Sequence, residues 1–390
     1  MENKIAIIHV VESLDDKYGG PARSVPMISM GLQDLGIINI LISVDFDFAK
    51  NSVIAKDQRL RWDKVKPSNI AKGYYSAELK WKIKNTVTEL RENGFFVIIH
   101  LHSIWSFPSV AVFCVCRQIK VPYVISPRSS LQTESLKKNS FIKKIVGFLF
   151  INQFICQARF LHVTSDSEYA DVRDKFEGLN IFLSENGLDF TEFGLLPTKA
   201  EAKESIGVTA EERCILFMSR VNRRKGLDIL YESFSKLCEN QSNIILLIAG
   251  PVDDVHIIDD ILFDAKNKGI EASIKYLGMT KGVERLNLFS AADVFVLPTK
   301  FENFGMSIAE AFASGLRVIT TKMTPWQEAE KLGFCQLVDR DCRSFQVAIE
   351  KYLENDISDS TRTDMKNYIV SNYDYRKKAA ELVAQYEKLL

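Results

Sequence analysis

The feature that most constrains the fold is a series of short, almost wholly apolar segments separated by amphipathic stretches. Examples are "IAIIHVV" at 5–11 and "FFVIIHLH" at 95–102, and later in the chain "IILLIAG" at 244–250 and "VFVLPT" at 294–299. Segments of this kind are typical of parallel strands in a sheet that helices cover on both faces. Because the alternation of strands and helices occurs twice, we predict an α/β protein with two Rossmann-like, doubly wound domains.

The chain of 390 residues is long enough for two domains. The segment 188–208 is the expected boundary, because it contains a glycine, a proline and a charged helix start but no apolar strand pattern. We therefore predict an N-terminal domain over 1–195, a C-terminal domain over 196–370, and a helix over 371–390 that could pack back on the first domain.

Charge and cysteine content narrow the possible settings. The 50 basic and 50 acidic side chains cancel, whereas wholesale nucleic-acid binding usually requires a basic excess, so no nucleic-acid partner is expected. The seven cysteines form no spaced framework, which is typical of a reduced compartment. The N-terminus does not resemble a signal peptide, and no segment reaches the roughly 20 apolar residues of a spanning helix. We expect a cytoplasmic protein.

The first candidate binding loop is "DDKYGGPARS" at 15–24, which follows the first predicted strand. Gly19 and Gly20 would let backbone N–H groups approach an anion, and the helix that follows would add a favourable field. The spacing is not G-x-G-x-x-G, so dinucleotide binding of the dehydrogenase type is disfavoured. The alternative is a plain turn without a ligand.

The second candidate loop is "SRVNRRKGLD" at 219–228, which follows a strand of the second half. Arg220 and Lys225 would project from the end of that strand. An arginine, which can bind bidentately, and a lysine, which acts as a point charge, are together suited to a diphosphate. The alternative is a solvated basic surface loop.

The third candidate is "KFENFGMSIAEAFASG" at 300–315, a loop followed by a helix. Backbone N–H groups near Gly305, Met306 and Ser307 would lie at the helix start, where they could bind a phosphate. Glu310 lies inside the apolar helix, and its carboxylate could accept two hydrogen bonds from the vicinal hydroxyls of a ribose. The alternative is a structural Glu310 that pairs with a core arginine or lysine.

Residues 302–310 resemble the E-x-F-G-x-x-x-x-E signature of the retaining glycosyltransferases of family 4, also called glycosyl transferases group 1. The loops at 15–24 and 219–228 resemble the glycine-rich and G-R-x-x-x-x-K-G-x-D motifs of that family, and "NGLD" at 186–189 resembles its N-G-V-D. The resemblance implies the GT-B fold, in which two Rossmann-like domains face a central cleft. The chain departs from the family pattern at Ser219, Thr299 and Arg317, and Arg317 could face the cleft.

The resemblance also implies roles for individual residues. Arg220 and Lys225 would neutralise the donor diphosphate, Glu302 would hold the donor sugar and Glu310 the ribose. The implied catalytic residues are His102, near the reacting carbon, with Arg220, Lys225 and Glu302. The implied donor-binding residues are Gly19, Gly20, Arg220, Lys225, Asn303, Phe304, Gly305, Met306, Ser307 and Glu310. Arg23 and Arg128 are expected on the acceptor side.

The implied reaction is retaining transfer of a hexose from a UDP- or GDP-sugar to a glycan or polyprenyl-diphosphate-linked acceptor. A metal or other cofactor is not expected, and a bacterial surface polysaccharide such as O-antigen or capsule is the implied setting. Two alternatives remain at this point. One is another GT-B enzyme, either a sugar-nucleotide epimerase or a phosphorylase. The other is a non-catalytic binding module.

Two further segments suggest other binding. "DFD" at 45–47 imitates an Asp-x-Asp metal motif, but its alternation with apolar residues suits a strand end with outward carboxylates, so we expect no metal there. The segment 137–160 places four lysines before an apolar helix that is too short to span a bilayer. It is either a buried helix of the first domain or a helix that binds an anionic membrane surface, which would make the protein peripheral.

Overall fold

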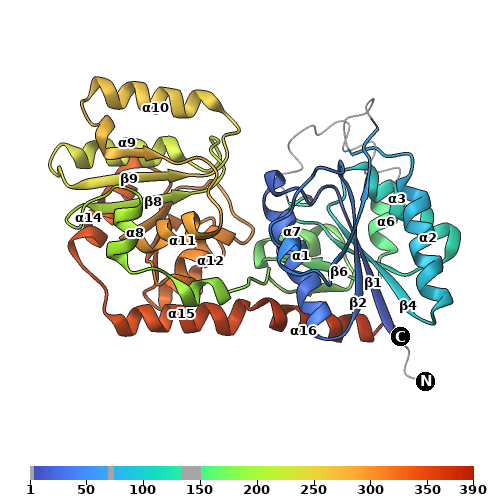
Figure 1. The fold of residues 1–390 in the computed structure, drawn as a ribbon. Helices are drawn as coiled ribbons and strands as arrows, with labels where there is room; N and C mark the ends of the chain where they lie inside the picture. The colour runs from blue at the N-terminus through green and yellow to red at the C-terminus, as the bar shows by residue number, and fades with distance from the viewer. Residues whose placement is uncertain (1–3, 69–73, 133–150) are drawn as a thin grey trace. The chain divides into compact units, whose positions relative to one another are not determined.

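The computed structural model describes residues 4–68, 74–132 and 151–390. Contacts divide the chain into two compact units: unit 1, Met1–Asp189 with Tyr373–Leu390, and unit 2, Phe190–Asn372. Each unit is a parallel sheet flanked by helices (Figure 1). The chain enters unit 2 six residues before the boundary expected from the sequence.

Unit 1 is built on a seven-stranded parallel sheet with the order β3-β2-β1-β4-β5-β6-β7. The central strands are apolar on both faces because helices cover both sides, as the near-continuous apolar runs predict. The strands are β1 (Ile5–Val11), β2 (Ile38–Val44), β3 (Arg61–Val65), β4 (Phe96–His102), β5 (Tyr123–Ser126), β6 (Leu161–Val163) and β7 (Ile181–Leu183).

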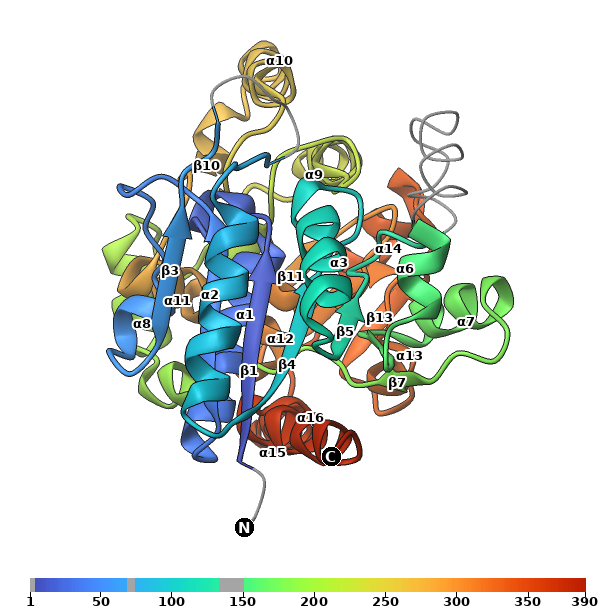
Figure 2. The same cartoon turned by 90° about the vertical axis from the view of Figure 1, so that its right-hand side faces the viewer.

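Alternate residues of β1 point into two different cores. Ile5 and Ile7 pack with α1 and α16, whereas Ala6 and Ile8 pack with α2 and α3. Figure 2 views unit 1 from the side on which α2 and α3 cover the sheet. The helices of unit 1 are α1 (Gly20–Asp34), α2 (Leu79–Glu92), α3 (Phe107–Ile119), α6 (Asn152–Cys156), α7 (Asp166–Lys175) and α16 (Tyr375–Glu387), with short 3-10 turns η1 (Asp16–Tyr18) and η2 (Ile54–Lys56).

Unit 2 repeats the architecture with a six-stranded parallel sheet of order β10-β9-β8-β11-β12-β13. Its strands are β8 (Arg213–Met218), β9 (Ile244–Ala249), β10 (Ile274–Tyr276), β11 (Val294–Leu297), β12 (Val318–Thr321) and β13 (Cys335–Val338). Its α-helices are α8 (Lys199–Ser205), α9 (Leu227–Cys238), α10 (Val255–Asn267), α11 (Gly282–Ala291), α12 (Met306–Ala313), α13 (Gln327–Lys331), α14 (Cys342–Glu354) and α15 (Asp359–Tyr373), and its 3-10 turns are η4 (Thr191–Leu195) and η5 (Glu271–Ser273).

The C-terminal helix α16 belongs to unit 1. It packs on α1 so closely that a Cβ atom added to Gly31 would lie 2.5 Å from the Cβ of Ala379. On the sheet side, the hydroxyl of Tyr386 lies 2.6 Å from Nδ1 of His100, and both side chains are buried. Small residues on the helices and one buried polar contact therefore attach the end of the chain to unit 1.

The segment 137–160 is only partly described, because residues 133–150, with all four of its lysines, lie outside the described residues. In the remainder, Phe154 and Ile155 of α6 are buried in the core of unit 1. Within the described parts of the chain, no helix is long and apolar enough to cross a membrane.

Candidate functional site

In each sheet the strand order reverses at one point, and the predicted residues follow the strands at that point. The reversal lies between β1 and β4 in unit 1 and between β8 and β11 in unit 2. Open α/β sheets bind ligands beyond the carboxyl ends of such strands, because the connections diverge to opposite faces there. Arg220 and Lys225 follow β8, Glu302 follows β11, and His102 is the last residue of β4.

In unit 2 the structure brings Lys225 and Glu302 into contact. The Lys225 ammonium forms an ion pair with Oε1 of Glu302, and both side chains are largely shielded from solvent. Gly226 makes this possible: its φ is +77°, and an added Cβ would lie 2.1 Å from the carbonyl oxygen of Pro298. The backbone N–H of Lys300 also donates to the carbonyl of Arg224 at 2.6 Å. The loop after β8 and the loop after β11 are therefore held together by both backbone and side-chain contacts.

Arg220 has its own carboxylate partner. Its Nε and Nη2 donate to the two carboxylate oxygens of Asp253 at 3.0 and 2.7 Å, and Asn222 donates to the same side chain at 2.9 Å. Burial alone would raise the pKa of Asp253, but the hydrogen bonds from Arg220 and Asn222 outweigh it and lower that pKa. The backbone just before Arg220 passes very close to Gly250. A Cβ added to Gly250 would lie 1.9 Å from the carbonyl oxygen of Ser219, so only a glycine fits there.

Phe304 and Trp326 fix the start of the helix that follows Glu302. Phe304 is buried, and its carbonyl accepts a hydrogen bond from the indole N–H of Trp326 at 2.9 Å. Gly305 begins α12 with a φ of +84°. The first N–H groups of a helix have no partner within it, so those of Met306 and Ser307 are available to an anion. The side chains of Asn303, Met306 and Ser307 are half-buried.

Glu310 is buried one turn further along α12, with 1% of its side chain exposed. Its Oε1 lies 2.5 Å from Nη1 of Arg285, a residue of α11, and the same guanidinium pairs with Glu192. From the sequence, Glu310 could either bind a ribose or pair with an arginine or lysine of the core. The structure contains such a pair, with Arg285. Arg285 and Glu192 were not found from the sequence, because nothing in their own segments distinguishes them from surface residues.

In unit 1 the glycine-rich loop begins α1. Gly19 has a φ of +80° and precedes the helix, and Gly20 is its first residue. A Cβ added to Gly20 would meet no atom within 4 Å, so packing within the chain does not require a glycine there. This open space leaves the backbone of Gly20 accessible to a ligand. Arg23, in the first turn of α1, is half-buried.

His102 lies in a buried network with Arg128. Nη2 of Arg128 lies 3.2 Å from Nδ1 of His102, and Nη1 donates to Ser24 at 3.0 Å and to Asn186 at 2.6 Å. A guanidinium only donates, so Nδ1 of His102 accepts and its proton resides on Nε2. Nε2 then donates to Nδ1 of His9 at 3.0 Å. Burial lowers the pKa of His102 well below its usual value and that of Arg128 to about 10.

Three residues with strained backbone mark the same edge of unit 1. Ser103, Arg128 and Ser129 have φ values of +72°, +54° and +67°, which cost energy for residues other than glycine. The fully buried carboxylate of Glu168 holds the turn, accepting from the backbone N–H groups of Ser129 at 2.5 Å and Thr164 at 2.9 Å. Sequence analysis missed Glu168, since nothing in its local pattern distinguishes it from a surface carboxylate.

Two expectations need correction. Asp45 of the "DFD" segment does not point outward: it is buried and accepts hydrogen bonds from Ser13, from the backbone N–H of Leu14 at 2.8 Å and from Ser43 at 2.6 Å. Arg317 does not face the ligand-binding edge either. It precedes β12, at the opposite end of the sheet, and donates to the carbonyl of Tyr352 at 2.6 Å.

The described residues contain one cluster that could hold a metal ion: His9, His100 and His102. The three imidazoles are buried, and the rings of His100 and His102 stack with centroids 4.3 Å apart. Nδ1 of His102 faces the guanidinium of Arg128. A positive neighbour at this distance disfavours a bound cation.

Comparison with known proteins agrees with this geometry. Residues 198–371 match the family model of glycosyl transferases group 1, which covers almost all of unit 2. Unit 2 is therefore similar to group 1 glycosyltransferases over nearly its whole length. The family resemblance expected from the motifs is therefore confirmed at this level.

Two curated glycosyltransferases are similar to the chain. The D-inositol 3-phosphate glycosyltransferase of Corynebacterium urealyticum is 24% identical over 250 residues, which cover 61% of this chain and 58% of that protein. The UDP-Gal:alpha-D-GlcNAc-diphosphoundecaprenol alpha-1,3-galactosyltransferase of Escherichia coli is 22% identical over 294 residues, 73% of each chain. The chain thus spans less than two thirds of the length of the corynebacterial relative.

The fold extends the similarity to unit 1. The crystal structure of Anabaena HepE in complex with UDP and glucose matches 98% of this chain and 100% of its own, with a TM-score of 0.77 and 14% sequence identity. At this identity the match shows the fold alone. With the two parallel sheets described above, it confirms the predicted α/β GT-B fold class.

Proposed function

We propose that this protein is a retaining glycosyltransferase that transfers a hexose from a UDP-sugar to a hydroxyl group of a glycan or of a polyprenyl-diphosphate-linked oligosaccharide. The reaction would need no metal. The observation that carries the proposal is the ion pair between Lys225 and Glu302, which lies where the strand order of the group 1 domain reverses.

The arrangement around this ion pair suits a nucleotide-diphosphate sugar. Arg220 and Lys225 supply two positive charges from the loop after β8, and the start of α12 adds backbone N–H groups that favour an anion. Glu302 lies beside Lys225, where its carboxylate can accept hydrogen bonds from sugar hydroxyls while the ammonium binds a phosphate oxygen. Leaving-group charge on the diphosphate would thus be stabilised without a metal.

The same arrangement supports the proposal that the configuration is retained. If the diphosphate stays bound on one face of the sugar, the acceptor hydroxyl can attack from that face, and a phosphate oxygen can take its proton. The chain's part in this step is to hold the leaving group in place, which is the role proposed for Arg220 and Lys225. His102 is proposed to act near the reacting carbon. Its Nε2–H now donates to His9, so it would have to turn or release that bond.

The ligands of similar proteins support the donor and acceptor classes. HepE was crystallised with UDP and glucose, and the name of the E. coli relative gives UDP-Gal as donor and a diphosphoundecaprenol-linked sugar as acceptor. Synthesis of a bacterial surface polysaccharide at the cytoplasmic side of the membrane is the setting we propose. A GDP-sugar is the alternative donor.

Lys225→Met, compared with Lys322→Met, tests the proposal. Lys322 also lies in unit 2 and forms a lysine–carboxylate pair, with Asp339 at 2.9 Å, but it is exposed and belongs to none of the predicted motifs. The protein would be titrated calorimetrically with UDP, GDP and ADP, and then incubated with the hexose derivative of the nucleotide that binds. Acceptor glycosides would be present, with and without EDTA.

We expect one nucleotide to bind the wild-type protein and Lys322→Met equally, and Lys225→Met at least about tenfold more weakly, because one charge-assisted contact is lost. NMR should show that the product has the same anomeric configuration as the donor, and the product should also form in the presence of EDTA. Inversion would overturn the retaining mechanism. Equal nucleotide binding by both variants would overturn the site, and release of free nucleotide without any glycoside product would favour an epimerase or phosphorylase.

A further inference from the structure

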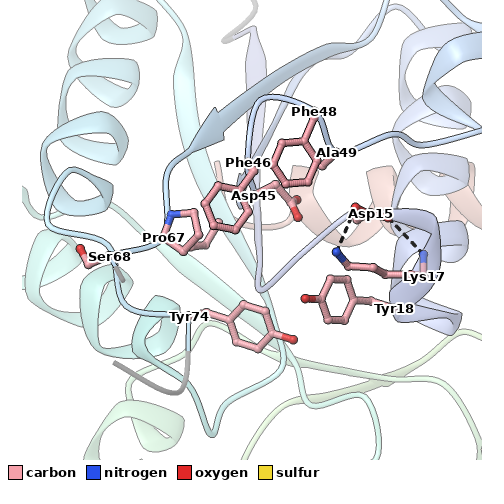
Figure 3. Close-up of a pocket in the computed structure, with 11 residues that line it drawn as sticks. Asp15, Lys17, Tyr18, Asp45, Phe46, Phe48, Ala49, Pro67, Ser68 and Tyr74 are labelled. Atoms are coloured by element: carbon pink, nitrogen blue, oxygen red, sulfur yellow. Dashed lines mark hydrogen bonds and ion pairs between the residues drawn. The ribbon is translucent and has the colours of Figure 1, made fainter. Parts of the chain in front are cut away.

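Unit 1 contains a cavity that none of the predicted residues explains. It encloses about 340 Å³ and lies beyond the carboxyl ends of β1, β2 and β3, next to the glycine-rich loop (Figure 3). This volume is at the lower end of the roughly 300–1,000 Å³ typical of small-molecule sites. The cavity is lined by Asp15, Lys17, Tyr18, Val44, Asp45, Phe46, Phe48, Ala49, Pro67, Ser68 and Tyr74.

Two pairs of aromatic rings dominate the lining. The rings of Phe46 and Phe48 are stacked, with centroids 5.2 Å apart and an interplanar angle of 7°. On the opposite side in Figure 3, Tyr18 and Tyr74 meet edge to face at 5.9 Å. Phe48 is 72% exposed and Phe46 41% exposed, so this pair does not contribute to the core. Two adjacent exposed phenyl rings at the rim of a cavity are typical of a ligand-binding surface.

The buried carboxylate of Asp45 fixes this geometry. Hydrogen bonds hold Asp45 inward, whereas Phe46 and Phe48, which follow it beyond the end of β2, are exposed and stack on each other. The aromatic surface is therefore preorganised by the loop that follows β2. A preorganised surface loses little conformational entropy on binding.

Polar groups sit between the aromatic pairs. Asp15 and Lys17 form a partly exposed ion pair at 3.5 Å, and the ammonium of Lys17 lies 5.2 Å from the centre of the Tyr18 ring. Burial raises the pKa of Tyr74, so its phenol stays protonated and can donate a hydrogen bond. The cavity thus offers carboxylate, ammonium and phenol groups as well as aromatic faces.

This combination discriminates between possible ligands. A lipid chain would desolvate Asp15, Lys17 and the tyrosine hydroxyls without giving them hydrogen bonds, which costs free energy. A pyranose ring has an apolar C–H face that can pack on an aromatic ring and a rim of hydroxyls that can satisfy the polar groups. A free diphosphate would meet the carboxylate of Asp15 as well as Lys17.

We propose that this cavity binds a pyranose ring of the acceptor glycan, with the ring packed against Phe46 and Phe48 and its hydroxyls bound by Asp15, Lys17 and Tyr74. The inference rests on the proposed function, and it assigns the acceptor a sugar rather than a lipid as the group recognised here. The cavity shares the loop of Tyr18 with Gly19 and Gly20, so the acceptor sugar would bind directly beside the proposed donor contacts of unit 1.

Phe48→Ala tests this assignment, with Phe263→Ala as its control. Phe48 and Phe263 are exposed to almost the same extent, 72% and 70%, but Phe263 lies on α10 of unit 2. Neither change removes a core side chain, so both variants should fold. Saturation-transfer NMR would measure binding of the methyl glycosides of glucose, galactose, mannose and N-acetylglucosamine, and of dodecyl phosphate as a lipid probe, to the full chain. Calorimetry with UDP would be run on the same samples.

We expect at least one glycoside to bind the wild-type protein and Phe263→Ala equally and Phe48→Ala at least about fivefold more weakly, with UDP affinity unchanged in all three. A Tyr74→Phe variant should bind the same glycoside more weakly, because it lacks one hydrogen-bond donor. No glycoside binding, or equal binding by Phe48→Ala, would overturn the inference. So would binding of dodecyl phosphate alone that is lost in Phe48→Ala. If UDP did not bind to the wild-type protein, that result would contradict the proposed function and would not concern this cavity.

Discussion

The Cα of Gly226 lies so close to the carbonyl oxygen of Pro298 that an added Cβ would be 2.1 Å from that oxygen. This contact joins the loop after β8 to the loop after β11, and it places Lys225 against Glu302. The carbonyl belongs to the backbone at the end of a buried strand and cannot move aside. The geometry of the proposed donor site therefore depends on the absence of a side chain at position 226.

Gly226→Ala should destabilise unit 2 more than Gly333→Ala. Both glycines have nearly the same φ, +77° and +78°, but Gly333 has no atom within 4 Å of an added Cβ. The left-handed backbone alone costs roughly 1–2 kcal/mol for alanine, and the collision at Gly226 should add about 1–3 kcal/mol. Urea unfolding would give the stabilities and calorimetry the affinity for UDP, which should fall only in Gly226→Ala. Equal losses of stability would contradict the proposed coupling of the two loops.

Gly31→Ala should destabilise unit 1, although alanine is the better helix former. In a free helix the change would stabilise by about 1 kcal/mol. Here the added Cβ would lie 2.5 Å from the Cβ of Ala379 and 2.8 Å from the carbonyl oxygen of Tyr375, which forces α16 away from α1. Hydrogen exchange of the α16 peptide should therefore rise.

Gly20→Ala is the matched control in the same helix. Its added Cβ meets nothing within 4 Å, so stability should change little. Binding of the donor should nevertheless weaken, because a methyl group would occupy the open space over the first turn of α1. If Gly31→Ala were the more stable of the two, the close packing of α16 would be refuted.

Unit 1 should lose stability as the pH falls below about 6.5. Burial lowers the pKa of His9 and of His162 to about 3, and it lowers those of His100 and His102 well below their usual value of 6.5. Between these values the unfolded chain binds protons that the folded chain does not. Each histidine therefore removes up to about 1.4 kcal/mol of stability per pH unit, and the loss continues until the folded-state pKa is reached.

Hydrogen exchange of β1 and β4 between pH 6.5 and 4 measures this dependence, after correction for the intrinsic exchange rate. His9→Gln should reduce the slope by up to about 1.4 kcal/mol per pH unit. The matched control, His256→Gln, replaces an exposed histidine of α10 in unit 2 and should leave the slope for β1 and β4 unchanged. If the stability of β1 and β4 in the wild-type protein did not change with pH, the histidines would not be buried in their neutral form.

Glu310→Gln and Glu192→Gln separate a structural role from a ligand-binding role. Both glutamates pair with Arg285, but only Glu310, which is 1% exposed, is proposed to bind the ribose. Weakening the buried pair should cost Glu310→Gln about 2 kcal/mol or more, and the more exposed Glu192→Gln less. UDP affinity should fall roughly tenfold in Glu310→Gln only, by loss of a charge-assisted hydrogen bond. Unchanged UDP affinity in Glu310→Gln would leave Glu310 as a purely structural residue.

The class of the fold was accessible from the sequence because it depends on local pattern. Buried parallel strands need continuous apolar runs, and the helices between them need an apolar face, so both signals repeat along the chain. The loops of Gly19, Arg220 and Glu302 could be placed at strand ends for the same reason. Their spacing within single segments carried the family resemblance, which the match over 198–371 confirms for the loops of Arg220 and Glu302.

Contacts between distant segments were not accessible. The partner of Glu310, Arg285, is a charged residue of another helix, and nothing in its own segment marks it as buried. Asp45 was expected to face outward from the alternation around it, but hydrogen bonds from the loop after β1 hold it inside. Phe46 and Phe48, which follow Asp45 in the chain, are exposed and line the cavity.

The sequence by itself determined two α/β domains and the loops in which a ligand would be bound, because apolar periodicity and glycine spacing are patterns of a few consecutive residues. Only the tertiary structure decided which polar side chains meet: Lys225 with Glu302, Arg220 with Asp253, and Arg128 with His102. The physical reason is that an ion pair or a buried hydrogen bond depends on distances of about 3 Å between side chains. Such distances are set by packing across the sheet, which the order of residues along one strand does not specify.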